Sequence, residues 1–184
     1  MSFPPFILVT GNPDKVTEAE RILGFRPRHE PLDLPEIQSL DLAEVLEAKV
    51  EEAYRRFGEP VVVEETGLYL DAMNGFPGPL VKWMLDAMGP EGIAATCSRL
   101  GNDGAEVRTA LAYFDGERMQ MAEGTVRGRL APEPRGKNGF GWDPVFMPES
   151  EPKTYAELDP EEKDRFGHRG RAWVAFRNLF VAES

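Results

Sequence analysis

The sequence has little cysteine, little positive charge and no long apolar run. Its only cysteine, Cys97, cannot form an intrachain disulfide, and its apolar neighbours predict a small buried side chain. Lysine and arginine number 21 against 32 acidic residues, and the net charge of −11 argues against non-specific binding to nucleic acid or to an acidic membrane. An anionic ligand would therefore need a local basic pocket.

Targeting features are also missing from the start of the chain. Met1 to Val9 lacks a basic start, and its apolar run is too short for a signal peptide or a membrane span, so we expect a cytoplasmic protein. No repeat or low-complexity tract is visible. The 184 residues fit one globular domain over 1–184, which would bury about 70% of the surface of the unfolded chain without a disulfide or structural metal.

The segment Pro60 to Leu68 changes from apolar to polar within one strand length. Val61 to Val63 predict a central strand buried on both faces, and Glu64 to Gly67 follow where ligands of α/β sheets usually bind. Since neighbouring residues of a strand point to opposite faces, we expect at most one of the two carboxylates in any one pocket. The other would be solvated or paired with a cation, and an ordinary polar strand end is the simpler alternative.

A strand, a tight turn and a helix are predicted at the N-terminal end. Phe6 to Val9 is apolar, Thr10 to Lys15 contains Gly11 and Asn12, and apolar residues then recur at helical spacing. Glycine allows a close turn, and the unpaired N–H groups of a helix start can hold an oxyanion beside the positive charge of Lys15. The spacing of a Walker A loop is absent, and a plain turn is the alternative.

Three prolines within residues 26–38 forbid a helix and predict an extended edge strand or loop. There Glu36 lies between apolar neighbours, so it must be exposed or paired with a cation. Asp41 and Glu44 then predict a capping box that opens a helix ending near residue 57. Lys49 lies in this helix, where most lysines are solvated, but it follows apolar positions and could lean towards a pocket.

The middle of the chain predicts a loop, two helices and a hairpin. Residues 73–79 are too rich in glycine and proline for regular structure, and helices are expected over 80–88 and 90–100. Trp83 in the first helix fits a subunit contact or the core equally well. Two β-like runs around Asp115-Gly116 predict a hairpin that extends the sheet.

Residues 139–146 combine two glycines, two aromatic rings and a carboxylate. Phe140 and Trp142 are two residues apart, and Asp143 follows. Alternating aromatics more often face a core, yet the surrounding glycine, aspartate and proline favour a site wall, because a flat aromatic pair beside a polar anchor suits a nucleobase.

The C-terminal part is predicted to be helical over 155–162 and 170–181. Residues 163–171, which we expect between these helices, form the most basic segment of an acidic chain. A basic run is usually a solvated surface, but this one is a candidate reader of an anion or a base.

Six short segments in this order resemble the inosine triphosphate pyrophosphatase family. They are Thr10-Gly11-Asn12 with Lys15, Leu34 to Gln38, Glu64 to Leu68, Phe76 to Pro79, Phe140 to Pro144, and His168-Arg169. These segments are distributed over nearly the whole length of the chain. The run Pro77 to Trp83 is more similar to the archaeal and eukaryotic branch than to the usual bacterial one.

The resemblance implies an elongated α/β fold in which helices flank a central mixed sheet and two lobes enclose the nucleotide. It implies a homodimer that uses Mg²⁺ to hydrolyse inosine, deoxyinosine and xanthosine triphosphates to the monophosphate and pyrophosphate, which cleanses the nucleotide pool. Glu36 and Glu65 would bind the metal, with Glu65 as the catalytic acid proposed to act as general base. The substrate would contact Thr10, Gly11, Asn12, Lys15, Lys49, Thr66, Phe140, Gly141, Trp142, Asp143, Lys163, His168 and Arg169.

The chain departs from the family pattern at two positions. Glu65 replaces the usual aspartate and is one methylene longer, and Gly167 replaces the serine that commonly precedes the His-Arg pair. Neither change removes a required charge. Two other functions remain open: a related pyrophosphatase with a different base preference, and a non-catalytic nucleotide-binding regulator.

Overall fold

The apolar runs of the sequence build one seven-stranded mixed sheet. The computed structural model describes residues 4–181. Three long antiparallel strands form the centre of the sheet, and short strands flank them in the order β2-β1-β3-β5-β6-β7, with β4 paired to β3. The strands are β1 (Ile7–Val9), β2 (Arg28–Glu30), β3 (Val61–Leu70), β4 (Pro77–Gly78), β5 (Gly104–Phe114), β6 (Met119–Leu130) and β7 (Phe146–Pro148).

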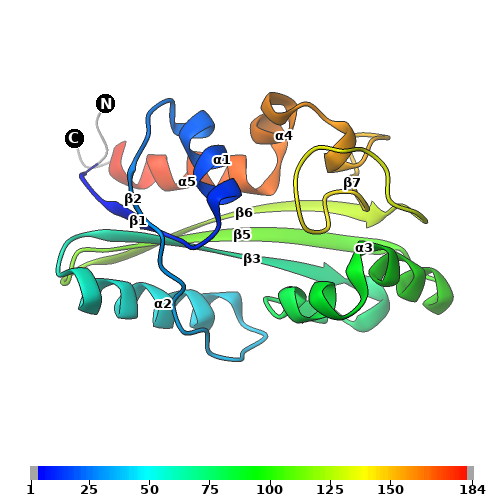
Figure 1. The fold of residues 1–184 in the computed structure, drawn as a ribbon, viewed down its shortest axis with the longest axis horizontal. Coiled ribbons are helices and arrows are strands. Elements are labelled where there is room, and N and C mark those ends of the chain that lie inside the picture. Colours follow the sequence, from blue (N-terminus) through cyan, green and yellow to red (C-terminus); the bar gives the residue numbers. More distant parts are fainter. Residues whose placement is uncertain (1–3, 182–184) are drawn as a thin grey trace.

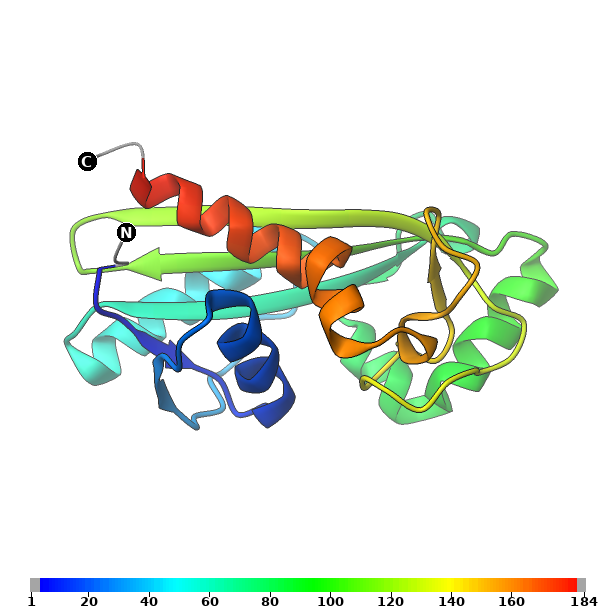
Figure 2. The same ribbon diagram turned by 90° about the horizontal axis from the view of Figure 1, so that it is seen from above.

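Helices cover both faces of this sheet. In Figure 1, α2 and α3 lie on one face, whereas α1, α4 and α5 lie on the other. Figure 2 shows α5 running along β6. The α-helices are α1 (Pro13–Leu23), α2 (Leu42–Phe57), α3 (Val81–Leu100), α4 (Pro160–Phe166) and α5 (His168–Val181), and short 3₁₀ turns occur at Asp71–Met73 and Tyr155–Glu157. The expected elongated α/β architecture is therefore confirmed. None of the described helices is long and apolar enough to cross a membrane.

One edge of β3 is open in the middle. β1 pairs with β3 only at Val61 and Val62, and β4 pairs with it only at Leu68 and Tyr69. On the other edge, β5 pairs with β3 from Val61 to Leu70. Within the described chain, residues 63–67 of β3 thus have no strand partner on the first edge, and their backbone faces a gap between β1 and β4.

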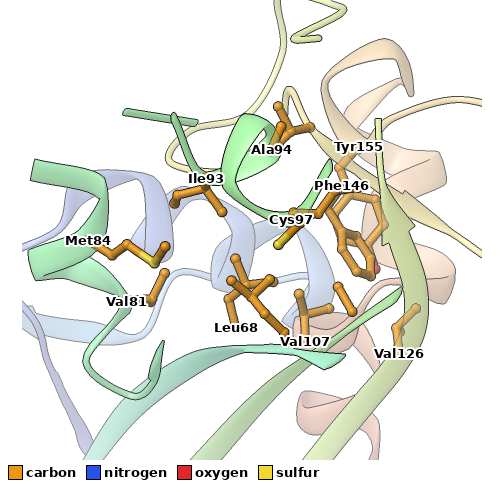
Figure 3. Packing of buried hydrophobic residues seen from close by; sticks show 14 of the residues in the cluster. Leu68, Val81, Met84, Ile93, Ala94, Cys97, Val107, Val126, Phe146 and Tyr155 are labelled. Atoms are coloured by element: carbon orange, nitrogen blue, oxygen red, sulfur yellow. The ribbon is translucent and has the colours of Figure 1, made fainter. Parts of the chain in front are cut away.

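Apolar side chains pack on both faces of the sheet. Figure 3 shows the cluster beside α3, where Leu68, Cys97, Phe146 and Tyr155 meet. Cys97 is fully buried, as predicted. Trp83 is 60% exposed, so its core alternative is wrong.

Three details of the local predictions are corrected. Asp41 caps α2 by accepting from the Ala43 N–H, but Glu44 accepts from the Ser39 hydroxyl at 2.7 Å, so the capping box is absent. Residues 73–79 contain the short strand β4, because Pro77 and Gly78 reach the open edge of β3.

The predicted helix over 155–162 is also interrupted. A 3₁₀ turn ends at Glu157, and α4 begins at Pro160 under its own capping box from Asp159 and Glu162. A proline is well suited to the first turn of a helix and poorly suited to its interior, so a new helix starts there. The basic segment 163–171 consequently lies largely within α4 and α5 instead of between two helices.

Candidate active site

A cleft of about 550 Å³ lies at the open edge of β3. It is bordered by the turn between β1 and α1, residues 32–36, Lys49 of α2 and the start of α3. From the remaining side come Phe140, Gly141, Trp142 and Arg169. Because the gap in the sheet gives access to both faces of β3, Glu64 and Glu65 both line this cleft. The prediction that only one of them enters a given pocket is wrong for this reason.

Two carboxylates converge on Lys49. Its Nζ donates to Glu36 Oε1 at 2.7 Å and to Glu65 Oε2 at 2.5 Å. The ammonium group is largely shielded, with 12% of the Lys49 side chain exposed. The expectation that Glu36 is exposed or paired is confirmed on both counts, and Lys49 does lean into the pocket.

The charges around Glu65 keep it ionised. Burial alone would raise the pKa of this carboxyl, but Lys15, Lys49 and the Thr66 N–H hold it below its ordinary value. Burial alone would lower the pKa of Lys49, but Glu65 and Glu36 raise it above its ordinary value. The pair therefore presents a fixed negative charge and a fixed positive charge to the cleft.

On the opposite face of β3, Glu64 is buried against α1 and α5. Arg169 Nε donates to its two carboxylate oxygens at 2.9 and 3.0 Å. Lys15 reaches across the gap in the sheet and donates to the Glu64 backbone oxygen at 3.2 Å. Glu64 is thus paired with a cation, as the alternation of the strand predicts for the carboxylate on the other face.

Behind this pair lies a buried ionic cluster centred on Glu18. Its carboxylate accepts from Lys163 Nζ at 2.8 Å and from Arg169 Nη1. Lys163 also donates to Asp143 at 2.6 Å, and burial raises the pKa of Asp143 although Lys163 opposes the shift. Lys163 and Arg169 both lie over the Phe140 ring, at 5.1 and 5.5 Å from its centre. The cluster therefore packs two cations against an aromatic ring that borders the cleft.

Comparison with known proteins shows the family to which this chain belongs. The model of the Ham1 family matches residues 6–179. The chain belongs to the Ham1 family. The dITP/XTP pyrophosphatase of Methanopyrus kandleri is 41% identical over 95% of each chain. The inosine triphosphate pyrophosphatase of Kluyveromyces lactis is 36% identical over 96% of each.

Solved Ham1 structures share the fold. A nucleoside-triphosphatase, or dITP/XTP pyrophosphatase, from Mycobacterium abscessus is 34% identical, covers 92% of this chain and 97% of its own, and has a TM-score of 0.71. A HAM1 protein from Coxiella burnetii is 26% identical, covers 97% of this chain and all of its own, and has a TM-score of 0.83.

In this Ham1 protein, most of the predicted site residues meet in the cleft. Those that line it are Thr10, Gly11, Asn12, Lys15, Glu36, Lys49, Glu65, Thr66, Phe140, Gly141, Trp142 and Arg169. Asp143, Lys163 and His168 are buried and are not among the residues that line it. Within the basic run 163–171, Lys163 and Arg169 are buried and paired with carboxylates, whereas Arg165 and Arg171 are exposed.

Two residues that contact this Ham1 site are not predicted from the sequence. Glu18 follows Lys15 by three residues and so faces the same side of α1, a spacing that could have singled it out. Thr109 lies in the middle of β5 with no local signal, and only the sheet register brings it against Thr66.

Within residues 4–181, no three His, Cys, Asp or Glu side chains are grouped to hold a metal ion by themselves.

Proposed function

We propose that this Ham1 protein is a Mg²⁺-dependent pyrophosphatase that hydrolyses inosine, deoxyinosine and xanthosine triphosphates to the monophosphate and pyrophosphate. The observation that carries the proposal is the convergence of Glu36 and Glu65 on one point of a cleft that also contains Lys15 and Lys49. The names of the relatives from Methanopyrus kandleri and Kluyveromyces lactis support the substrate class.

The two carboxylates suit Mg²⁺ by their chemistry. This ion takes oxygen ligands, and in nucleotide enzymes it is usually held by one or two carboxylates together with substrate phosphates and water. Lys49 Nζ shows that the two carboxylate oxygens can share one cation. Glu36 and Glu65 would hold the metal, which would neutralise phosphate charge and lower the pKa of a bound water.

The lysines and the N-terminal turn would hold the triphosphate. Lys15 and Lys49 bring two positive charges to the cleft, and the start of α1 presents backbone N–H groups next to Asn12. Phosphoryl-type hydrolysis depends mainly on positioned phosphates and neutralised charge. Glu65 remains ionised under the influence of these lysines, which is the state required of a metal ligand and of a proton acceptor.

The aromatic and basic side chains would read the base. Phe140 and Trp142 border the cleft and offer flat faces for a purine. Arg169 can only donate, so a 6-oxo group suits it, whereas the amine of adenine would face it with a second donor.

One observation favours the alternative of a different base preference. In this structure Nε and Nη1 of Arg169 are already bonded to Glu64 and Glu18, so fewer donors are free for a 6-oxo group. A non-catalytic regulator is less well supported, because a pure binder does not need two carboxylates placed to share a cation.

Exposed apolar side chains support a homodimer. Trp83 and Phe76, near the start of α3, are 60% and 41% exposed, and large apolar residues in such positions often pack against a second subunit. We propose a cytoplasmic dimer of this chain, which sedimentation equilibrium would distinguish from a monomer.

Product analysis with a panel of triphosphates tests the proposed function. Purified protein is incubated with inosine, xanthosine, guanosine and adenosine triphosphates with Mg²⁺ or with chelator, and phosphorus NMR follows the products. We expect pyrophosphate as the first product from the inosine and xanthosine substrates only when Mg²⁺ is present. Stepwise release of orthophosphate would contradict the assigned bond, and preference for another base would establish the alternative.

A further inference from the structure

A row of three residues crosses the sheet beneath the first turn of α5. Thr66 of β3 is paired with Thr109 of β5, and Thr109 is paired with Gly124 of β6. A Cβ atom at Gly124 would collide with the backbone of His168 and Ala172. The glycine thus lets α5 rest directly on the sheet, which places the His168 ring against Thr109.

A chain of hydrogen bonds follows this row to Glu64. His168 Nδ1 lies 2.6 Å from Thr109 Oγ1, and Thr109 Oγ1 lies 2.9 Å from Thr66 Oγ1. The Thr66 hydroxyl is directed at Glu64 Oε1 across a longer distance of 3.5 Å. The four side chains belong to residues that are at most 6% exposed. With so little exposed surface, these polar groups depend on one another as hydrogen-bond partners.

The carboxylate end sets the direction of the chain. An ionised carboxylate can only accept, so the Thr66 proton points to Glu64. The Thr66 oxygen then accepts from Thr109, and the Thr109 oxygen accepts from His168. The reverse order would turn the Thr66 lone pairs towards the carboxylate with no proton between them, which is unfavourable in a buried site.

The His168 ring carries only one proton. Burial lowers its pKa well below the ordinary value of 6.5, and the nearby charges of Arg169, Lys163 and Lys15 act in the same direction. A neutral imidazole donates from one nitrogen and accepts at the other, and the partner of one nitrogen decides which is which.

We propose that Thr109 is a positioning residue that holds His168 as the Nδ1–H tautomer, so that Nε2 is left as a hydrogen-bond acceptor. The consequence for substrates rests on the proposed function. A 6-oxopurine carries a proton on ring nitrogen N1, whereas adenine does not. His168 is buried beside the cleft in this structure. In the substrate complex of the proposed function its Nε2 acceptor would meet the base, where it would complement the first class and mismatch the second.

Imidazole nitrogen NMR on ¹⁵N-labelled protein tests the tautomer directly. The chain has two histidines, so His29→Gln assigns the His168 signals by elimination. We expect His168 in the wild type to be protonated at Nδ1 and bare at Nε2. Thr109→Val keeps the side-chain shape without the hydroxyl and should shift the ring towards the Nε2–H form, whereas Thr109→Ser should retain the wild-type pattern.

The outcomes are decisive even if a variant does not fold. A wild-type ring protonated at Nε2 overturns the proposal without any substitution, and so does a folded Thr109→Val protein with an unchanged tautomer. For the link to substrates, the ratio of kcat/KM for inosine over adenosine triphosphate should fall about tenfold in Thr109→Val and recover in Thr109→Ser. An unchanged ratio refutes that link. Wild-type protein inactive on every triphosphate would refute the proposed function while leaving the tautomer result intact.

Discussion

Replacing Glu18 by alanine should remove the centre of the buried ionic cluster. The cluster joins the cations Lys15, Lys163 and Arg169 to the carboxylates of Glu18, Glu64 and Asp143. Glu18→Ala deletes the bonds from Lys163 and Arg169 and leaves three positive charges facing two negative ones. Each cation keeps one partner, Asp143 or Glu64. We therefore expect a loss of about 3 kcal/mol, the lower end of the range for breaking a buried ion pair.

Urea and thermal denaturation measure this loss. For a chain of this length, about 3 kcal/mol corresponds to a fall in Tm of roughly 6–12 °C. The urea m-value should stay unchanged, which would locate the effect in the folded state. Glu20→Ala is the matched control. Glu20 lies in the same helix, and its ion pair with Arg26 is a long, exposed one of 3.9 Å, so this substitution should cost less than about 0.5 kcal/mol. A Glu18→Ala protein within about 1 kcal/mol of wild type would refute the reasoning.

Three further outcomes are expected. Glu65→Gln should retain nucleotide binding but lower kcat by about 10²-fold or more, and near-normal kcat at saturating Mg²⁺ would transfer its role to another acid. Trp142→Ala should weaken binding of every purine triphosphate alike by about 1–3 kcal/mol, as titration calorimetry can measure, whereas a loss confined to one base would argue against stacking. Burial raises the pKa of Glu18, but Arg169 and Lys163 outweigh burial and hold this pKa below its ordinary value of 4.5. The ionised Glu18 side chain therefore stabilises the fold above pH 4.5, and this contribution disappears as the pH falls through the folded-state pKa. The difference in unfolding free energy between wild type and Glu18→Gln should hence be full at neutral pH and shrink on acidification below about 4.5, and a difference that grows there would reverse the sign of the argument.

Local sequence patterns predicted most elements because their causes are local. The three apolar β-branched residues Val61 to Val63 favour a buried strand, and β3 starts there, although it continues to Leu70. Its extension through Glu64 and Glu65 has no local signal, since charged residues lower strand propensity. The continuous register with β5 stabilises this extension, and that register is a tertiary property.

The candidate site was predictable where a residue type carries its chemistry, and less so where partners decide the outcome. The sequence indicates Lys49 as a candidate for the pocket, but its shared contact with Glu36 and Glu65 depends on how α2 packs on β3. The family resemblance implies that Lys163 contacts substrate, and its ion pairs with Glu18 and Asp143 in this structure could not be foreseen from the sequence. Positive charge in a sequence does not reveal which carboxylates will neutralise it.

The gap beside β3 also bears on self-association. An exposed strand edge invites pairing with a strand of another molecule, which is a route to aggregation. Here the free edge spans only residues 63–67 and is enclosed at one end by β1 and at the other by β4. Lys15 places a charged group against it from the side. The free edge is therefore too short and too charged to pair with a strand of another molecule, while Glu64, Glu65 and Thr66 on it still line the cleft.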